Sequence, residues 1–402
     1  MKNILSIVLL MSALYDSRAQ VADSVITGNK NVNDVYYSML NGIVKTEPNT
    51  NWDLAFEVNA SPYASIMINH ANGVQVWNST FAIADWSSFD TSAKSGWNSL
   101  YNNPYRWNNG ALNRYTDGVF NVGWGVYNPS THVVSGDSIF LIKLGDGSYK
   151  KLVITSLNVP NYTIKYADLD GSNEKTVSVS IDNYKDKNFA YYSMVNNMEI
   201  DREPDTKTWD MVFTKYIQYI HGANQHYLVS GVWINKARKS AEARNVSTSI
   251  TDYSAFSFSD SASVIGYDWK TFDLSSNTYS VTDNLVYFVQ LTDKTVYKLI
   301  FTGYSGSATG TYYFTKQALS PAQIKVLPEH LVSVYPNPVL TKTMVSVPDG
   351  SGLLSIDLID LMGKRVYSGS KTEMDLSSLS SGTYFLQVRT DSGIYRSKLI
   401  KH

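Results

Sequence analysis

The sequence predicts an all-β protein made of two tandem antiparallel β domains and a small C-terminal β-sandwich. Three observations support this fold class. Tyr is abundant at 29 of 402 residues and is accompanied by nine Trp, and aromatic residues favour strands. Short segments of alternating apolar and polar residues recur between Asn-Gly, Asp-Gly and Asn-Pro turn signals. A phrase in the first half of the chain is also repeated in the second half.

The N-terminal residues 1–19 have the pattern of a secretory signal peptide. Lys2 precedes an apolar run from Ile4 to Tyr15, and the small residues Ser17 and Ala19 suit a cut after Ala19. The apolar run is short for a permanent membrane span. We therefore predict that the chain is exported.

The repeated phrase joins an aromatic pair to a Trp-Asp segment. Its first copy is Tyr36-Tyr37-Ser38-Met39 followed by Trp52-Asp53-Leu54-Ala55-Phe56, and its second is Tyr191-Tyr192-Ser193-Met194 followed by Trp209-Asp210-Met211-Val212-Phe213. An acidic residue and Pro stand between the two parts in each copy, as Glu47-Pro48 and Glu203-Pro204. Weaker echoes follow, including Gly73–Trp77 with Gly231–Trp233. The pattern predicts a duplicated domain, with copies at 20–184 and 185–317.

Local patterns predict the elements inside these copies. Residues 138–144 and 149–154 form the clearest hairpin, and 284–291 with 296–302 form its counterpart. The stretch 85–127, rich in Trp, Tyr and Asn, predicts long loops with aromatic packing. Asn235 to Arg244 contains Ala, Lys, Arg and Glu, which favour a short exposed helix, with a basic ligand patch as the alternative. Asp53 and Asp210 are expected to bond turn backbone.

Residues 318–331 are expected to be a linker, and residues 332–402 a compact antiparallel sandwich. The last unit contains Tyr335-Pro336-Asn337-Pro338, an Asp360–Lys364 turn, the Gly382–Val388 strand and a basic Lys398–Lys401 ending. It resembles the type A C-terminal sorting domain of type IX secretion in Gram-negative bacteria. This resemblance implies an address recognised by the outer-membrane secretion machinery, and release from the cell or attachment to its surface.

The duplicated unit resembles the HmuY family. The resemblance is carried by the segments Trp52–Phe56 and Trp209–Phe213, the phrase Gly266-Tyr267-Asp268-Trp269 and the terminal hairpins. HmuY-like proteins are all-β proteins that bind haem outside the cell and pass it to an outer-membrane receptor. The resemblance implies haem as the cofactor, iron acquisition as the role and an outer-membrane receptor as a possible partner.

Four histidines are the candidates for binding haem iron. The chain has no Cys, which excludes disulfides and thiolate ligands, so His or Met are the expected axial ligands. Each copy contains two His: His70 and His132 in the first, His221 and His226 in the second. An ordinary surface or loop histidine is the alternative for each. Met39 and Met194 recur within strand-like patterns and fit core positions.

Other functional classes have little support. Only 17% of residues are charged and the net charge is −1, so no basic surface is available for nucleic acid. No nucleophile elbow, phosphate loop or His-Glu-x-x-His motif occurs, and we predict no enzyme. Asp168–Glu174 resembles the start of a calcium loop, but Val179 replaces its final Glu, so a turn is expected. The alternative to haem binding is a non-enzymatic surface module for a glycan or protein, suggested by the aromatic loops of 85–127.

Overall fold

The computed structural model describes residues 20–402 except 60–63, 115, 117, 320–325, 328–331, 348–351, 362 and 391–392. The predicted signal peptide and most of the predicted linker lie outside the described residues. The chain divides into a body, which ends at Leu319 and leaves out 293–295, and a C-terminal unit of 293–295 and 320–402. Strands dominate both units, and nearly all of their pairings are antiparallel. The all-β prediction is therefore confirmed.

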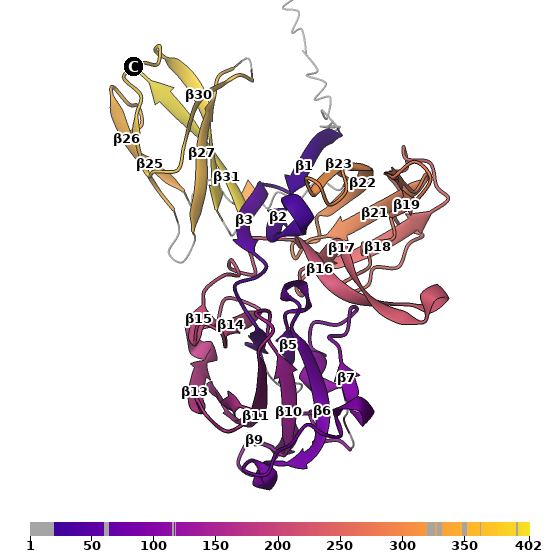
Figure 1. Cartoon of the computed structure of the whole chain (residues 1–402). Coiled ribbons are helices and arrows are strands. Elements are labelled where there is room, and N and C mark those ends of the chain that lie inside the picture. The colour runs from indigo at the N-terminus through magenta and orange to yellow at the C-terminus, as the bar shows by residue number, and fades with distance from the viewer. Residues whose placement is uncertain are drawn as a thin grey trace, which may run out of the picture. The chain divides into compact units, whose positions relative to one another are not determined.

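The body consists of two lobes (Figure 1). Lobe A contains the strands and 3-10 turns between residues 54 and 200. Its elements are β4 (Leu54–Glu57), β5 (Ile66–Ile68), η2 (His70–Asn72), β6 (Gln75–Ala82), η3 (Ile83–Asp85), η4 (Lys94–Gly96), β7 (Asn98–Leu100), η5 (Ala111–Asn113), β8 (Gly125–Asn128), β9 (Val133–Gly136), β10 (Ser138–Lys143), β11 (Tyr149–Asn158), β12 (Asn161–Asp168), β13 (Lys175–Ser180), η6 (Ile181–Tyr184), β14 (Phe189–Ser193) and β15 (Met198–Ile200).

Lobe B combines the start of the chain with residues 211–318. Its elements are β1 (Val21–Ile26), η1 (Asn29–Asn31), β2 (Asn33–Ser38), β3 (Gly42–Pro48), β16 (Met211–Ile220), η7 (His221–Ala223), β17 (Gln225–Ile234), β18 (Lys239–Arg244), β19 (Lys270–Asp273), β20 (Thr278–Val281), β21 (Leu285–Gln290), β22 (Val296–Tyr304) and β23 (Thr311–Ala318). Figure 1 shows the indigo strands β1–β3 next to the orange strands of this lobe.

Each lobe has one larger and one four-stranded sheet around an apolar core. In lobe A the larger sheet has the strand order β13-β12-β11-β10-β6-β7, and β9 pairs with both β11 and β8. The four-stranded sheet of this lobe has the order β15-β14-β4-β5. In lobe B the sheets are β1-β23-β22-β21-β18 and β17-β16-β2-β3, with β19-β20 as a separate pair. Trp124 and Phe140 lie fully buried in the core of lobe A, as do Phe213 and Trp269 in lobe B. Both predicted hairpins, β10–β11 and β21–β22, are confirmed.

The C-terminal unit is a small antiparallel structure with its own core. It contains β24 (Val326–Leu327), β25 (Ser333–Tyr335), β26 (Lys342–Ser346), β27 (Leu353–Ile359), β28 (Arg365–Gly369), β29 (Glu373–Asp375), β30 (Gly382–Thr390) and β31 (Gly393–Lys401). They form the sheets β24-β31-β30-β27-β28 and β25-β26-β29. Ile356, Leu358, Leu386 and Val388 are completely buried between them.

The two copies of the repeated phrase pair with each other. Strand β2 of the first copy pairs with β16 of the second, with Tyr37 opposite Met211 and Tyr36 opposite Val212. Strand β14 of the second copy pairs with β4 of the first, with Tyr192 opposite Leu54 and Tyr191 opposite Ala55. The register is the same in both pairs. These pairings cross the predicted boundary between residues 184 and 185, because each lobe is completed by strands from the other copy.

The aspartates of the phrase hold this exchange in place. The Asp53 carboxylate accepts the backbone N–H groups of Met194 (2.7 Å) and Val195 (3.2 Å). The Asp210 carboxylate accepts the backbone N–H of Met39 at 2.7 Å. Each Asp therefore caps the turn that follows the aromatic pair of the opposite copy, which confirms the turn-bonding role predicted for these residues.

An asparagine missed by the sequence comparison extends the symmetry. The side chain of Asn69 donates to the Trp52 carbonyl at 2.8 Å, and that of Asn235 donates to the Trp209 carbonyl at 2.9 Å. Strand β5 pairs with β4 as β17 pairs with β16, with Ile68 opposite Leu54 and Ile234 opposite Met211. The predicted echo of Gly73–Trp77 with Gly231–Trp233 was therefore misaligned, since Ile68 is the counterpart of Ile234.

The predicted helix at 235–244 is wrong. Residues 239–244 form β18, which pairs along its full length with β21. Ala241 and Ala243 are buried beside Val286 and Phe288, so these small residues at alternate positions lie on the buried face of the sheet. The packing of this face outweighs the intrinsic helix propensity of Ala, Lys and Glu.

Removing either capping carboxylate should destabilise the body. Asp53→Ala leaves the backbone N–H groups of Met194 and Val195 without their acceptor. Asp210→Ala removes the acceptor of the Met39 N–H and also the buried ion-pair partner of Arg238. We expect each to lower the free energy of unfolding by about 2–4 kcal/mol. Urea unfolding followed by tryptophan fluorescence measures the loss. The control is Asp260→Ala at an exposed position. Equal effects of all three substitutions would contradict the capping role.

Candidate functional site

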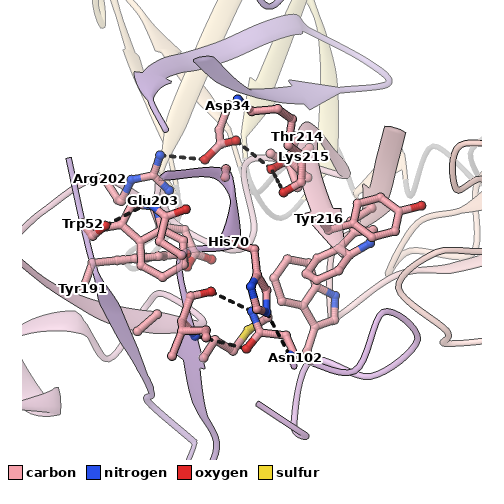
Figure 2. Close-up of a pocket in the computed structure, with 18 of the residues that line it drawn as sticks. Asp34, Trp52, His70, Asn102, Tyr191, Arg202, Glu203, Thr214, Lys215 and Tyr216 are labelled. Atoms are coloured by element: carbon pink, nitrogen blue, oxygen red, sulfur yellow. Dashed lines mark hydrogen bonds and ion pairs between the residues drawn. The ribbon is translucent and has the colours of Figure 1, made fainter. Parts of the chain in front are cut away.

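A cavity of about 60 Å³ lies in the body where the two lobes meet (Figure 2). The connections between the lobes form part of its wall. The connection from β3 to β4 contributes Trp52, and the connection from β15 to β16 contributes Arg202, Glu203 and Trp209. Because both connections pass here, the cavity is a direct product of the strand exchange.

Aromatic rings packed edge to face form much of the wall. Tyr191 meets Trp52 with ring centroids 5.1 Å apart, and Tyr36 meets Trp209 at 5.0 Å. These are the aromatic and Trp positions of the repeated phrase, again paired across the copies. Trp107, from the loop region of 85–127, meets Trp233 of β17 at 4.8 Å. T-shaped contacts of this kind are favourable beyond the burial of area alone.

Arg202 joins the two connections. Its side chain is only 2% exposed and donates to the Asp34 carboxylate at 2.8 Å and to the Pro48 carbonyl at 3.2 Å. Its guanidinium also lies over the ring of Tyr191 at 5.1 Å. Burial opposes its charge, but Tyr36 and Asp34 outweigh burial and raise the pKa of Arg202. Breaking a buried pair of this kind is costly because it leaves an uncompensated charge.

Glu203 is the second buried acid of the site. Its carboxyl group accepts the backbone N–H groups of Asn188 (3.1 Å) and Phe189 (3.2 Å) and the hydroxyl of Tyr191 (3.2 Å). Burial raises the pKa of Glu203 to about 7, and these hydrogen bonds counteract part of the rise. At neutral pH this side chain therefore changes its charge inside the body.

Four buried donors that line the cavity have no hydrogen-bond partner among the described residues. They are the indole nitrogens of Trp52, Trp209 and Trp233 and the hydroxyl of Tyr216, and the Tyr216 hydroxyl lies against Gly266 rather than among the other three. A buried N–H or O–H group normally has a partner, and leaving one unpaired costs about 1–3 kcal/mol. The cavity thus has a surplus of hydrogen-bond donors.

His70 is the only one of the four predicted haem ligands that lines the cavity. Its Nε2 accepts the backbone N–H of Asn102 at 3.2 Å, as drawn in Figure 2. Burial lowers the pKa of His70 to about 3, while a hydrogen bond with the Val74 backbone acts in the opposite direction. His70 is therefore neutral, and its Nε2 is already engaged within the fold.

The structure brings three of the four histidines together and separates the fourth. Tyr101 stacks on His226, with ring centroids 3.7 Å apart, and lies 5.7 Å from the ring of His70. Tyr219 contacts both His226 (5.1 Å) and His221 (4.9 Å) at the end of the β16–β17 hairpin. Burial, followed by the charge of Arg114, lowers the pKa of His226.

His132 lies apart from this group. It occupies the turn between β8 and β9, where its Nδ1 is 2.7 Å from the hydroxyl of Tyr127. Met39 and Met194 are buried, as predicted for core positions. His132, Met39 and Met194 do not line the cavity.

Sequence reasoning missed most of the cavity residues. It treated Glu203 only as part of a strand-breaking pair, and it gave Asp34, Arg202 and Tyr216 no role. One signal was present, since Arg precedes the acidic-Pro pair in the second copy, whereas Thr46 precedes it in the first.

The described residues contain no group of three or more His, Asp or Glu side chains placed to hold a metal ion. The turn predicted at Asp168 is confirmed, because its carboxylate accepts the side chain of Asn173 at 2.6 Å and that of Ser172 at 3.3 Å. No helix in the described part of the chain has the length and apolar character needed to cross a membrane.

Comparison with known proteins identifies the C-terminal unit. Residues 333–402 match the model of a family described as a secretion system C-terminal sorting domain. No curated protein is matched by the chain. The match confirms the predicted sorting domain, which interacts with the secretion machinery. The protein is exported and reaches the cell surface or the medium.

The buried Glu203 predicts a pH dependence of stability. Its folded pKa of about 7 lies above the ordinary value of 4.5, so the folded chain binds more protons between these values. The free energy of unfolding should therefore fall as pH rises from 4.5 through 7, by about 3 kcal/mol for this group. Urea unfolding at several pH values should show this fall for the natural chain and a weaker one for Glu203→Gln.

The matched control is Glu47→Gln, since Glu47 is the acidic residue of the same pair in the other copy. This variant should keep the pH dependence of the natural chain. If Glu203→Gln keeps it as well, Glu203 does not titrate in this range.

Proposed function

We propose that this exported protein is a non-enzymatic binding protein that holds a glycan at the cavity between the lobes. The observation that carries the proposal is the aromatic wall of the cavity and its continuation onto exposed Tyr side chains. The apolar face of a sugar ring packs well on aromatic rings, and its hydroxyl groups suit the amides and carboxyls at their edges.

The aromatic surface continues from the cavity along one face of the β16–β17 hairpin. Thr214 and Tyr216 line the cavity, and Gln218 is the next residue of β16 on the same face. Tyr227 is directly opposite Gln218 on β17 and is 57% exposed. Tyr105, 51% exposed, accepts a hydrogen bond from Gln218 at 2.9 Å. Two exposed Tyr rings therefore flank a residue that adjoins the cavity wall.

The carboxyl groups favour binding over hydrolysis. A glycosidase uses two carboxyl groups that face the substrate. Asp34 is occupied by Arg202 at 2.8 Å and by the Thr214 hydroxyl at 2.7 Å. Glu203 accepts three hydrogen bonds from the protein. Both carboxyl groups are thus already hydrogen-bonded within the protein and do not face a substrate.

Glycan binding should depend on the exposed rings. In a glycan array followed by titration calorimetry, we expect retention of a defined set of glycans. Tyr105→Ala and Tyr227→Ala should each weaken binding about tenfold, because each removes an aromatic surface worth about 1–1.5 kcal/mol. The control is Tyr313→Ala on β23, where the ring is 46% exposed but lies outside the cavity wall. A blank array, or equal losses for all three variants, would contradict the proposal.

Haem is the second candidate ligand, and His226 is the residue that favours it. This side chain is exposed, and no hydrogen bond to it occurs within the described part of the chain. The cavity of about 60 Å³ is far below the roughly 300–1,000 Å³ of typical cofactor sites, so a porphyrin would bind outside it, against the hairpin.

For this candidate, adding haem should produce a shifted Soret band that disappears in His226→Ala. His132→Ala should keep the band, because His132 lies apart from the other three histidines. An unshifted haem spectrum in the natural chain would rule out this ligand, and loss of the band in both variants would rule out His226 as the specific axial ligand.

A further inference from the structure

We propose that the cavity receives the acetamido group of an N-acetylated amino sugar. This inference rests on the proposed glycan binding and specifies which part of the glycan enters the body. It follows from the unpaired donors, the charges and the size of the cavity.

The unpaired groups require an acceptor. Trp209 is completely buried and Trp233 is 5% exposed, yet their indole N–H groups have no partner within the described residues. An indole N–H can only donate. A ligand that satisfies Trp209 and Trp233 must therefore bring acceptor oxygens into the cavity.

The charges favour an uncharged acceptor. Arg202 is neutralised by Asp34 at 2.8 Å, and Glu203 is already hydrogen-bonded to the protein. Lys215 lines the cavity, but its ammonium donates to the Lys30 carbonyl at 3.3 Å. The donors left for a ligand are mainly neutral, and they suit a carbonyl oxygen better than a carboxylate or phosphate, which prefer charged partners.

The size selects a small group. One water needs roughly 10–15 Å³ of cavity volume, so a cavity of about 60 Å³ accommodates on the order of four to six non-hydrogen atoms. An acetamido group has about four such atoms, whereas a complete sugar ring with its hydroxyls has about twice to three times as many. The carbonyl oxygen would accept from the indole groups, and the methyl group would pack on the aromatic wall.

The sugar ring would then remain outside the cavity. Tyr227 and Tyr105 lie along the same hairpin face and supply aromatic surfaces for it. The cavity would therefore bind the acetamido group, and the hairpin surface would bind the sugar ring. A sugar with a hydroxyl in place of the acetamido group would leave the indole N–H groups of the cavity unpaired. Its affinity should be lower by about the free energy of one unmade hydrogen bond.

Two trisaccharides test the inference in the full-length exported chain. Chitotriose carries acetamido groups, and cellotriose has hydroxyls at the same positions. Titration calorimetry should give at least tenfold tighter binding of chitotriose. Trp233→Phe removes one unpaired indole N–H of the cavity wall and should weaken chitotriose binding about tenfold. The matched control is Trp269→Phe, a buried Trp whose indole N–H is also unpaired but which lies outside the cavity wall, and it should leave binding unchanged.

The outcomes separate the two proposals. Equal binding of both trisaccharides would overturn the acetamido site and leave glycan binding standing. Blank titrations with both, together with a blank glycan array, would overturn both proposals. A crystal structure with chitotriose that shows only water molecules in the cavity would also overturn the acetamido site. Urea unfolding of Trp233→Phe and Trp269→Phe checks that any loss of affinity comes from a folded protein.

Discussion

The structure depends on two aspartates that each cap a turn belonging to the other copy of a repeat. Asp53 binds the turn at Met194, and Asp210 binds the turn at Met39. These bonds fix the register in which each aromatic strand pairs with the opposite Trp-Asp strand. Neither lobe holds its own four-stranded sheet without the exchanged strand, so the two lobes are parts of one body. The cavity exists because the connections required by the exchange meet between the lobes.

The two copies differ where their connections meet. Arg202 stands in one connection and bonds to Asp34 and to the end of the other connection at Pro48. No arginine occupies the corresponding position before Glu47, so the buried Arg202–Asp34 ion pair has no counterpart in the other connection. The result is an asymmetric cavity with an acid, a guanidinium and unpaired indole groups on a symmetric scaffold. Such a site can recognise a ligand that has no symmetry of its own.

Much of the fold could be predicted from the sequence, because its signals are local. The turn residues and the alternation of apolar and polar residues predicted the β10–β11 hairpin. The repeated Trp-Asp phrase predicted the two capping aspartates, and the motifs of the last unit predicted the sorting domain. The exchange could not be predicted, since identical phrases pair equally well within a copy or between copies. The β18 strand was mistaken for a helix because its partner β21 is distant in sequence. The cavity was missed because Asp34, Arg202 and Trp233 come together only after the exchange.

The exchanged strands also determine the order in which the chain folds. The Met39 N–H donates its hydrogen bond to a carboxylate 171 positions later, so β2 and β3 can pair only with each other until the second copy has formed. Contacts of such long range slow folding, because a large loop must close before they are gained. Until then the amino-terminal segment contains at most this two-stranded hairpin, which is only marginally stable in water on its own.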